Sequence, residues 1–234
     1  MFALVGTRRA AAAALTASLA FASTTTAQPS NVLEPPAEVA AKGTVFYVVP
    51  GKPGENIDQT RFTNTPPKSK KKVDFFTGFT NAIIGYAVSE SEGEPAKLVA
   101  GEFHLPVKSL DTGIKGRNRH LQQKNWLWAK KHPEIVFTIK RTENIRPKSG
   151  AAGGKAFDAT IVGDMTIRGQ TKEMAIPAEI AIIDGGDKGQ LMRIRATYSV
   201  KLSDFGVKNG IIGKRVADDI AIEQYLVLST KKPA

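Results

Sequence analysis

Residues Leu98–Ile139 read LVAGEFHLPVKSLDTGIKGRNRHLQQKNWLWAKKHPEIVFTI, and this stretch decides the fold. Two apolar runs that are typical of strands, Leu98–Val107 and Ile135–Lys140, enclose a segment rich in charged and aromatic residues. Within that segment Asp111 is a candidate N-cap for a short helix over Thr112–Gln123. Two strands joined by a charged helix and two Trp predict a lid or plug, because a hairpin turn needs no such segment.

The second half of the chain alternates apolar and polar residues with a period of two. That period gives each strand one dry face and one wet face. The last strand is predicted over Ile220–Leu228. In the three preceding runs the dry positions are Phe157, Ala159, Ile161, Gly163, Met165 and Ile167, then Met174, Ile176, Ala178, Ile180 and Ile182, then Ile194, Ala196, Tyr198, Val200 and Leu202.

About eight such strands, joined in sequence by short turns, need partners for their edges. Closure into an antiparallel barrel removes the edges and predicts an all-β fold with one short helix between two strands. A barrel of about eight strands either fills its interior with side chains or holds one ligand. Several inward candidates are small or slim, which favours a cavity, while a filled barrel or sandwich stays open: Ala159, Gly163, Ala178, Ala196 and Val200.

The N-terminal stretch is predicted to be a targeting segment and not part of the folded domain. Arg8-Arg9 precede an apolar run of small residues, and residues 1–27 are therefore predicted to be a secretory signal peptide. The residues after the Arg pair fit a twin-arginine motif poorly, which favours the general secretory route. Residues 28–43 are predicted to be a flexible leader and residues 44–230 one barrel domain. The expected location is periplasmic or secreted.

The net charge limits the classes of partner that the protein is expected to bind. The chain carries +11, and removing residues 1–27 takes away two Arg, which leaves 31 basic against 22 acidic residues. Nucleic acid is not an expected partner outside the inner membrane, and the positive balance suits an anionic membrane surface or simply a solvated surface. The basic run Lys68–Lys72 is predicted to be a solvated loop.

No set of residues in the sequence forms a catalytic or metal-binding pattern. The three His (His104, His120 and His132) lack metal spacing, and G-x-S-x-G and Cys are absent. The segment Gly206–Gly213 is rich in Gly but lacks the order of a phosphate-binding loop. We therefore expect a protein that is not an enzyme, with no metal and no cofactor; an enzyme acting on a lipid or small acid is the weakest alternative.

Several motifs in the same order resemble those of the YceI-like family, between about Val73 and Ser229. These are Ser109-Leu110-Asp111-Thr112-Gly113, Arg117-Asn118-Arg119-His120-Leu121, Trp126-Leu127, His132-Pro133-Glu134-Ile135-Val136-Phe137, Gly163–Lys172 and Asp204-Phe205-Gly206-Val207. The resemblance implies a periplasmic, lipocalin-like barrel that binds polyisoprenoid lipids. One departure is Asn118, which stands where many members carry Asp.

The favoured hypothesis is an exported barrel that sequesters an isoprenoid-type lipid or quinone in a cavity. The predicted cavity-lining residues are Phe103, Trp126, Phe137, Ile139, Ile161, Met165, Ile180, Ile182, Ile194, Ala196 and Tyr198. The family-motif residues expected at the mouth are Ser109, Thr112, Arg117, Asn118, His120 and Leu121.

The alternative hypothesis is a packed barrel without bound lipid. It would act as a stress-related or membrane-surface interaction protein and would dock through Lys68–Lys72 and Lys130-Lys131. The lipid's identity and the oligomeric state, a homodimer included, stay open at this point.

Overall fold

The computed structural model describes residues 32–51, 58–67, 74–90, 94–149 and 154–233. The predicted signal peptide and the basic run Lys68–Lys72 lie outside these residues. The helices are α1 (Ala37–Ala40), η2 (Val107–Ser109), α2 (Lys115–Leu121), η3 (Gly186–Lys188) and η4 (Leu202–Phe205). The strands are β1 (Gly43–Val48), β2 (Thr60–Asn64), β3 (Phe76–Thr80), β4 (Ile84–Glu90), β5 (Leu98–Pro106), β6 (Glu134–Lys148), β7 (Gly154–Ile167), β8 (Gln170–Asp184), β9 (Gln190–Lys201) and β10 (Asp219–Ser229).

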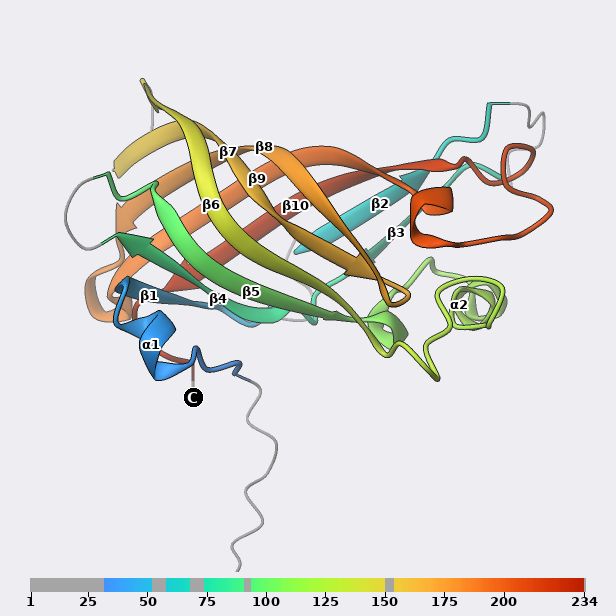
Figure 1. Cartoon of the computed structure of the whole chain (residues 1–234), viewed down its shortest axis with the longest axis horizontal. Coiled ribbons are helices and arrows are strands. Elements are labelled where there is room, and N and C mark those ends of the chain that lie inside the picture. The colour runs from blue at the N-terminus through green and yellow to red at the C-terminus, as the bar shows by residue number, and fades with distance from the viewer. Residues whose placement is uncertain (1–31, 52–57, 68–73, 91–93, 150–153, 234) are drawn as a thin grey trace, which may run out of the picture. The chain divides into compact units, whose positions relative to one another are not determined.

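The strands form one antiparallel sheet that closes on itself, as the sequence predicts (Figure 1). Among the described residues, β1, β4, β5, β6, β7, β8, β9 and β10 follow one another around the ring, and β1 pairs with β10 to close it. The remaining hairpin, β2–β3, extends from β10. Closure leaves the ring without a long free edge.

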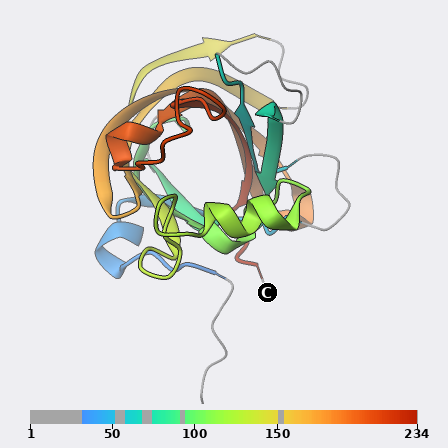
Figure 2. The same cartoon turned by 90° about the vertical axis from the view of Figure 1, so that its right-hand side faces the viewer.

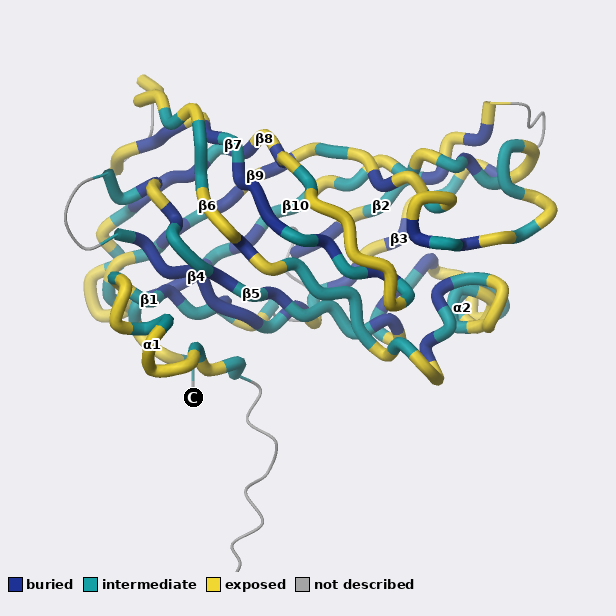
Figure 3. Tube along the Cα trace, in the orientation of Figure 1, coloured by how far each residue is buried: buried dark blue, intermediate teal, exposed yellow. Residues whose placement is uncertain are grey.

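The interior of the barrel holds the apolar positions of the alternating runs. These residues are buried or half-buried along β7, β8 and β9, as the tube coloured by burial shows (Figure 3). Cross-strand pairs place equivalent positions side by side, for example Phe157 opposite Ile180 and Ile180 opposite Ile194. The period of two therefore identifies the inward face correctly.

One end of the barrel is filled by its own side chains. Large residues from five strands meet there, each less than 2 % exposed: Phe46, Leu98, Ile180, Met192 and Leu228. Such close packing is usual for protein interiors and leaves no room for a ligand. We call this region the packed end.

At the other end, β10 changes its partner. Its last residues pair with β1, but Ala221–Gln224 pair with β2. Gln59 occupies the fork at 5 % exposure. Its side-chain amide accepts the Ile83 N–H at 2.8 Å and donates to the Val49 carbonyl at 3.3 Å. The hairpin β2–β3 thus replaces β1 and β4 in the wall of what we call the open end.

The backbone of Asp111 completes the wall of the open end. Its N–H donates to the Phe79 carbonyl at 2.9 Å, and its carbonyl accepts the Phe79 N–H at 2.8 Å. This bridge adds a segment to the ring beside β3. Because barrel diameter grows with the number of wall segments, the open end has space that the packed end lacks.

The predicted start of the helix differs from the structure. The predicted N-cap Asp111 lies in the wall, and α2 starts at Lys115 with Ile114 as its N-cap, so the helix is shorter than Thr112–Gln123. The predicted leader 28–43 contains the helical turn α1. His104 lies in the predicted strand Leu98–Val107, and its ring lies between Glu102 and Glu134 on the outer face of the wall.

Candidate functional site

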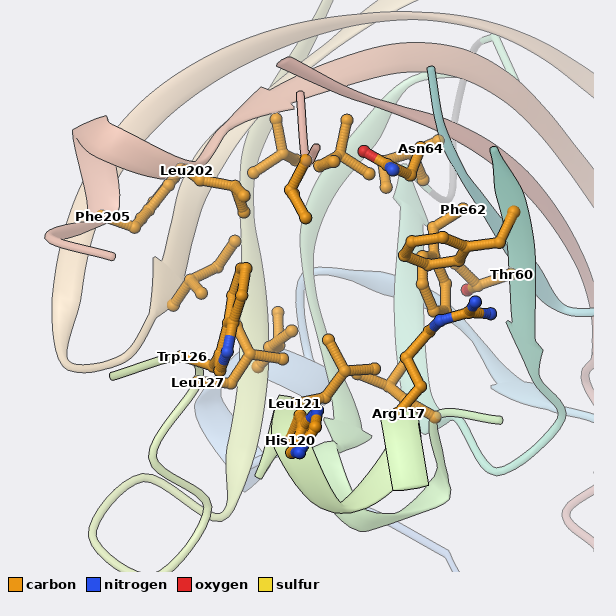
Figure 4. A pocket seen from close by; sticks show the side chains of 18 of the residues that line it. Thr60, Phe62, Asn64, Arg117, His120, Leu121, Trp126, Leu127, Leu202 and Phe205 are labelled. Carbon is orange, nitrogen blue, oxygen red and sulfur yellow. The ribbon is translucent and has the colours of Figure 1, made fainter. Parts of the chain in front are cut away.

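A cavity of about 570 Å³ occupies the open end of the barrel (Figure 4). Its wall is almost wholly apolar and comes from the inward faces of β5, β6, β7, β9 and β10, together with β2 and β3. A narrower space of about 80 Å³ shares Leu105, Ile135, Met165, Tyr198 and Gln224 with it and leads deeper into the barrel. The cavity therefore tapers from the open end toward the packed end.

Two segments cover the mouth of this cavity. Figure 2 shows α2 on one side of the barrel end and the segment after η4 on another. Leu121, Trp126 and Leu127 line the cavity from α2 and the residues after it, and Phe205 at the end of η4 and Ile211 after it line the cavity from the other side. The charged helix between two strands is thus a partial lid, as its composition predicts.

A hydrogen-bond network fixes the start of the first covering segment. The side-chain oxygen of Asn118 accepts the Thr112 N–H at 2.9 Å and the Thr112 hydroxyl at 2.6 Å. Its side-chain nitrogen donates to Asp111 Oδ1 at 2.8 Å, and that oxygen also accepts the Gly113 N–H. The hydrogen bond from Asn118 is the main cause that lowers the pKa of Asp111.

Arg168 ties the two covering segments together. It occupies the two-residue turn between β7 and β8, where Arg168 and Gly169 both have positive φ, as a tight hairpin of this kind requires. Its guanidinium donates to the Gly206 carbonyl at 2.7 Å and to the Lys124 carbonyl at 3.1 Å. One side chain thereby links the segment after α2 to the segment after η4.

Charged groups stand at the mouth, on the side of β3. Arg215 Nε donates to Asp74 Oδ1 at 3.0 Å, and the Asp74 residue is only 6 % exposed. The guanidinium of Arg117 lies 4.0 Å from the centre of the Phe76 ring. Burial lowers the pKa of Arg117, and the charge of Asp74 opposes that change. The mouth thus combines two Arg with one carboxylate.

Inside the cavity, few groups are polar. Gln224 donates to the Gln59 carbonyl at 2.8 Å and to the Thr60 hydroxyl at 2.9 Å. Its amide is therefore hydrogen-bonded to β2 and the residue before it, within the wall of the barrel. Tyr198 lines both parts of the cavity, and burial raises the pKa of its phenol. A neutral phenol among aliphatic side chains suits an apolar occupant better than a charged one.

Most of the predicted cavity-lining residues face this space. Trp126 lines the wide part, Met165 and Tyr198 line both parts, and the narrow part is lined by Phe103, Phe137, Ile139, Ile161, Ile194 and Ala196. Ile180 and Ile182 do not line it, because they lie in the packed end. Their alternation places them inside but does not indicate at which end.

The predicted mouth residues divide into two groups. Arg117, His120 and Leu121 line the cavity. Thr112 and Asn118 belong instead to the network that holds α2, and the Ser109 hydroxyl lies 2.7 Å from the Thr80 hydroxyl and donates to the Pro106 carbonyl at 2.7 Å. Their role is to shape the lid.

The sequence reasoning missed the contribution of β2 and β3. Phe62 and Phe76 line the cavity, and a Cβ at Gly78 would lie 2.2 Å from the Phe62 ring, so only Gly lets this ring lie against β3. A Gly inside an apolar strand-like run, as Gly78 is, indicates a bulge or a close contact. Nothing in the sequence indicates that this hairpin replaces β1 and β4 in the wall.

Val200, which the alternation predicts to point inward, and Ile222 also line the cavity, although neither is among the predicted cavity-lining residues. The cavity as a whole decides against the alternative of a barrel filled throughout by its own side chains.

The described residues contain neither a metal-binding cluster of side chains nor a membrane-spanning helix. No group of three or more His, Cys, Asp or Glu in that part of the chain is placed to hold a metal ion. None of the helices in the described ranges has the length and apolar character needed to cross a membrane.

Comparison with known proteins gives one family and several similar folds. The model of the YceI-like domain matches residues 65–228. A UPF0312 protein of Photorhabdus laumondii is 28% identical over 120 residues, which are 50% of this chain and 57% of that protein. The chain thus spans little more than half the length of the curated relatives it matches.

Solved structures with the same fold share little sequence with this chain. The YceI protein of Campylobacter jejuni has a TM-score of 0.53 at 22% identity, over 78% of this chain and 94% of that one. A polyisoprenoid binding domain from Saccharophagus degradans has a TM-score of 0.53 at 11% identity, over 80% and 98%. At these identities the likeness establishes the barrel fold.

Proposed function

Because the chain belongs to the YceI-like family and its barrel is hollow at one end, we propose that it is an exported protein that binds an isoprenoid-type lipid. The observation that carries the proposal is the tapering apolar cavity of about 570 Å³ with its continuation of about 80 Å³. Binding pockets for small molecules fall within this range of volumes. The proposed role is sequestration or transport of the lipid, with no chemical step.

The wall chemistry suits a hydrocarbon chain. Each methylene removed from water contributes about 0.8 kcal/mol, and aliphatic walls supply that gain without specific hydrogen bonds. The cavity offers such walls from several strands, with Leu105, Ile135, Ile167 and Ile222 among them. An isoprenoid or quinone tail gains free energy in proportion to its buried length.

The taper suggests how the lipid would lie. The narrow part between Phe103, Phe137 and Ile194 would take the end of the tail. The polar head would remain at the mouth, where Arg117 and His120 stand. A charged head placed deeper would have to leave water without a charged partner, which is costly.

The similar fold of the Saccharophagus degradans domain supports this ligand class, since its name describes polyisoprenoid binding. Export is supported by the predicted signal peptide at residues 1–27.

A single substitution inside the cavity provides the test. Val200→Phe adds a ring to the cavity wall, where the Val side chain is 7 % exposed, and it should reduce isoprenoid uptake by about tenfold or more. Ser199→Phe is the matched control, because the neighbouring side chain points outward and is exposed. Uptake of farnesol and of a longer polyprenol is measured by native mass spectrometry. Equal uptake by both variants, or none by the unmodified protein, would refute the proposal.

A further inference from the structure

The open end carries large apolar side chains that face solvent. Among the described residues, four large hydrophobic side chains are exposed, and all belong to segments that border this end: Phe75, Phe79, Ile114 and Ile211. Ile114 is 51 % exposed and Ile211 is 37 % exposed, and both also line the mouth of the cavity. Exposed apolar residues that gather in one place mark a surface for another apolar body.

Basic residues flank both Ile114 and Ile211 in the sequence. Residues 112–133, which include the lid helix, contain no Asp or Glu and carry Lys115, Arg117, Arg119, Lys124, Lys130 and Lys131. Ile211 lies between the exposed residues Lys208 and Lys214. Two acidic residues nearby in the sequence, Asp204 and Asp219, are also exposed. Each side of the mouth therefore presents an isoleucine flanked by positive charge.

The start of α2 is poorly suited to the stability of an isolated helix. Its N-cap is Ile114, which supplies no side-chain hydrogen bond, and its first turn has Lys115 and no acidic residue. Good N-caps are small polar residues, and positive charge near a helix N-terminus is unfavourable. Residues that work against local stability are expected at functional sites.

The same end is continuous with the proposed lipid cavity. A lipid that enters or leaves through a mouth in open water must cross water with its tail exposed. A mouth placed against a bilayer avoids that step. Exposed isoleucines can enter the boundary between headgroups and acyl chains, while lysines beside them attract anionic headgroups.

We propose that the open end, through Ile114 and Ile211 and the lysines beside them, docks this protein on the surface of an anionic lipid bilayer. The inference deepens the proposed function, on which it rests, by stating where the lipid is exchanged. The alternative hypothesis from the sequence placed docking at Lys68–Lys72, which lies outside the described residues, and at Lys130-Lys131, which belong to the basic segment beside the mouth.

Vesicle sedimentation tests the docking surface. The unmodified protein should bind vesicles of phosphatidylcholine with about one third phosphatidylglycerol, and binding should weaken in 0.5 M salt because salt screens exposed charges. The double variant Lys115→Glu/Lys214→Glu should bind about tenfold or more weakly. The double variant Ile114→Ser/Ile211→Ser should also bind more weakly, and its remaining binding should depend more on salt.

The matched control reverses the same charge at the packed end. Lys42→Glu/Lys155→Glu changes two exposed lysines near the starts of β1 and β7 and should retain vesicle binding within about twofold. If this control binds as weakly as Lys115→Glu/Lys214→Glu, net charge rather than the rim attracts the protein and the inference is wrong. Absence of binding by the unmodified protein would also overturn it.

Uptake of farnesol from solution separates this inference from the proposed function. Lys115 and Lys214 do not line the cavity, so the rim variant should take up farnesol like the unmodified protein. Loss of uptake in that variant would show that the rim is part of the cavity site and would overturn a separate docking surface. Vesicle binding by a protein that takes up no isoprenoid would leave the docking surface intact and refute the lipid-binding proposal.

Discussion

The two ends of the barrel use the same alternating pattern for opposite purposes. At the packed end, Ile180 and Met192 are fully buried among large neighbours. At the open end, Val200 and Ile222 also point inward, but they face a cavity. Both pairs lie on the long strands β8, β9 and β10. The comparison teaches that an apolar residue inside a barrel can stabilise the fold or bind a ligand, depending on what fills the space opposite to it.

The largest expected effect compares truncation at the two ends. Ile180→Ala removes a side chain from a filled region and should lower the free energy of unfolding by about 2–5 kcal/mol, because a new cavity remains. Ile222→Ala enlarges an existing cavity and should cost clearly less. Urea unfolding monitored by circular dichroism gives both values. Equal losses would show that the two ends are packed alike.

The fork where β10 changes partner provides the second prediction. Gln59→Ala would leave the Ile83 N–H and the Val49 carbonyl without the side-chain partners described above. An unsatisfied buried polar group costs about 1–3 kcal/mol, and this loss should appear in urea unfolding. Gln122→Ala, on the C-cap of α2, is the control and should change stability by less than about 0.5 kcal/mol. If the Gln59→Ala protein were as stable as the unmodified one, the hydrogen bonds of Gln59 would not stabilise the point where β10 changes partner, and this account of the open end would be wrong.

The lid gives a smaller effect. Asn118→Ala removes the hydrogen bonds to Thr112 and Asp111 and should cost about 1 kcal/mol. Since α2 packs at the rim, hydrogen exchange should accelerate in residues 112–123 while the packed end stays protected. Arg119→Ala, at an exposed neighbouring position, is the control. Unchanged exchange in the Asn118 variant would contradict the proposed role of this network.

The smallest effect concerns His104 on the outer wall. Burial lowers its pKa, but hydrogen bonds to Glu102 at 2.6 Å and Glu134 at 2.8 Å, with their charges, outweigh burial and raise it. A raised pKa in the folded state means that protonation stabilises the fold. That stability is fully present below the unfolded-state pKa of about 6.5 and disappears as pH rises through the folded-state pKa.

We therefore expect His104→Gln to reduce stability more at pH 5.5 than at pH 8.5, by less than about 1 kcal/mol, because the glutamates are partly exposed. Urea unfolding at the two pH values measures the difference. A larger loss at pH 8.5 would reverse the sign and contradict this account. Because His104 lies outside the cavity, lipid uptake should not change with this substitution.

Much of the site follows from periodicity and from the family motifs. Met165, Ile194, Ala196 and Tyr198 were predicted to face inward because they occupy the dry positions of their strands, and they line the cavity. Ile180 and Ile182 satisfy the same pattern but belong to the packed end. The alternation indicates on which face of the sheet a side chain lies. It does not indicate how far along the barrel axis that side chain lies.

The helix and its cap show a second limit. Asp111 is a good N-cap residue by type, but its backbone pairs with Phe79 of β3. That pairing joins residues 32 positions apart and displaces the helix start to Lys115. Local preference was overruled by a tertiary contact, as happens with weak propensities.

The sequence by itself determined the all-β fold, the family, and the inward face of the long strands, because side chains of a strand alternate whatever surrounds them. Only the tertiary structure decided that one half of the barrel is filled and the other hollow. That outcome depends on β10 leaving β1 for β2 and on which side chains share a layer of the barrel. The space inside a closed sheet is set by strands that are distant in sequence, and it has no local signature.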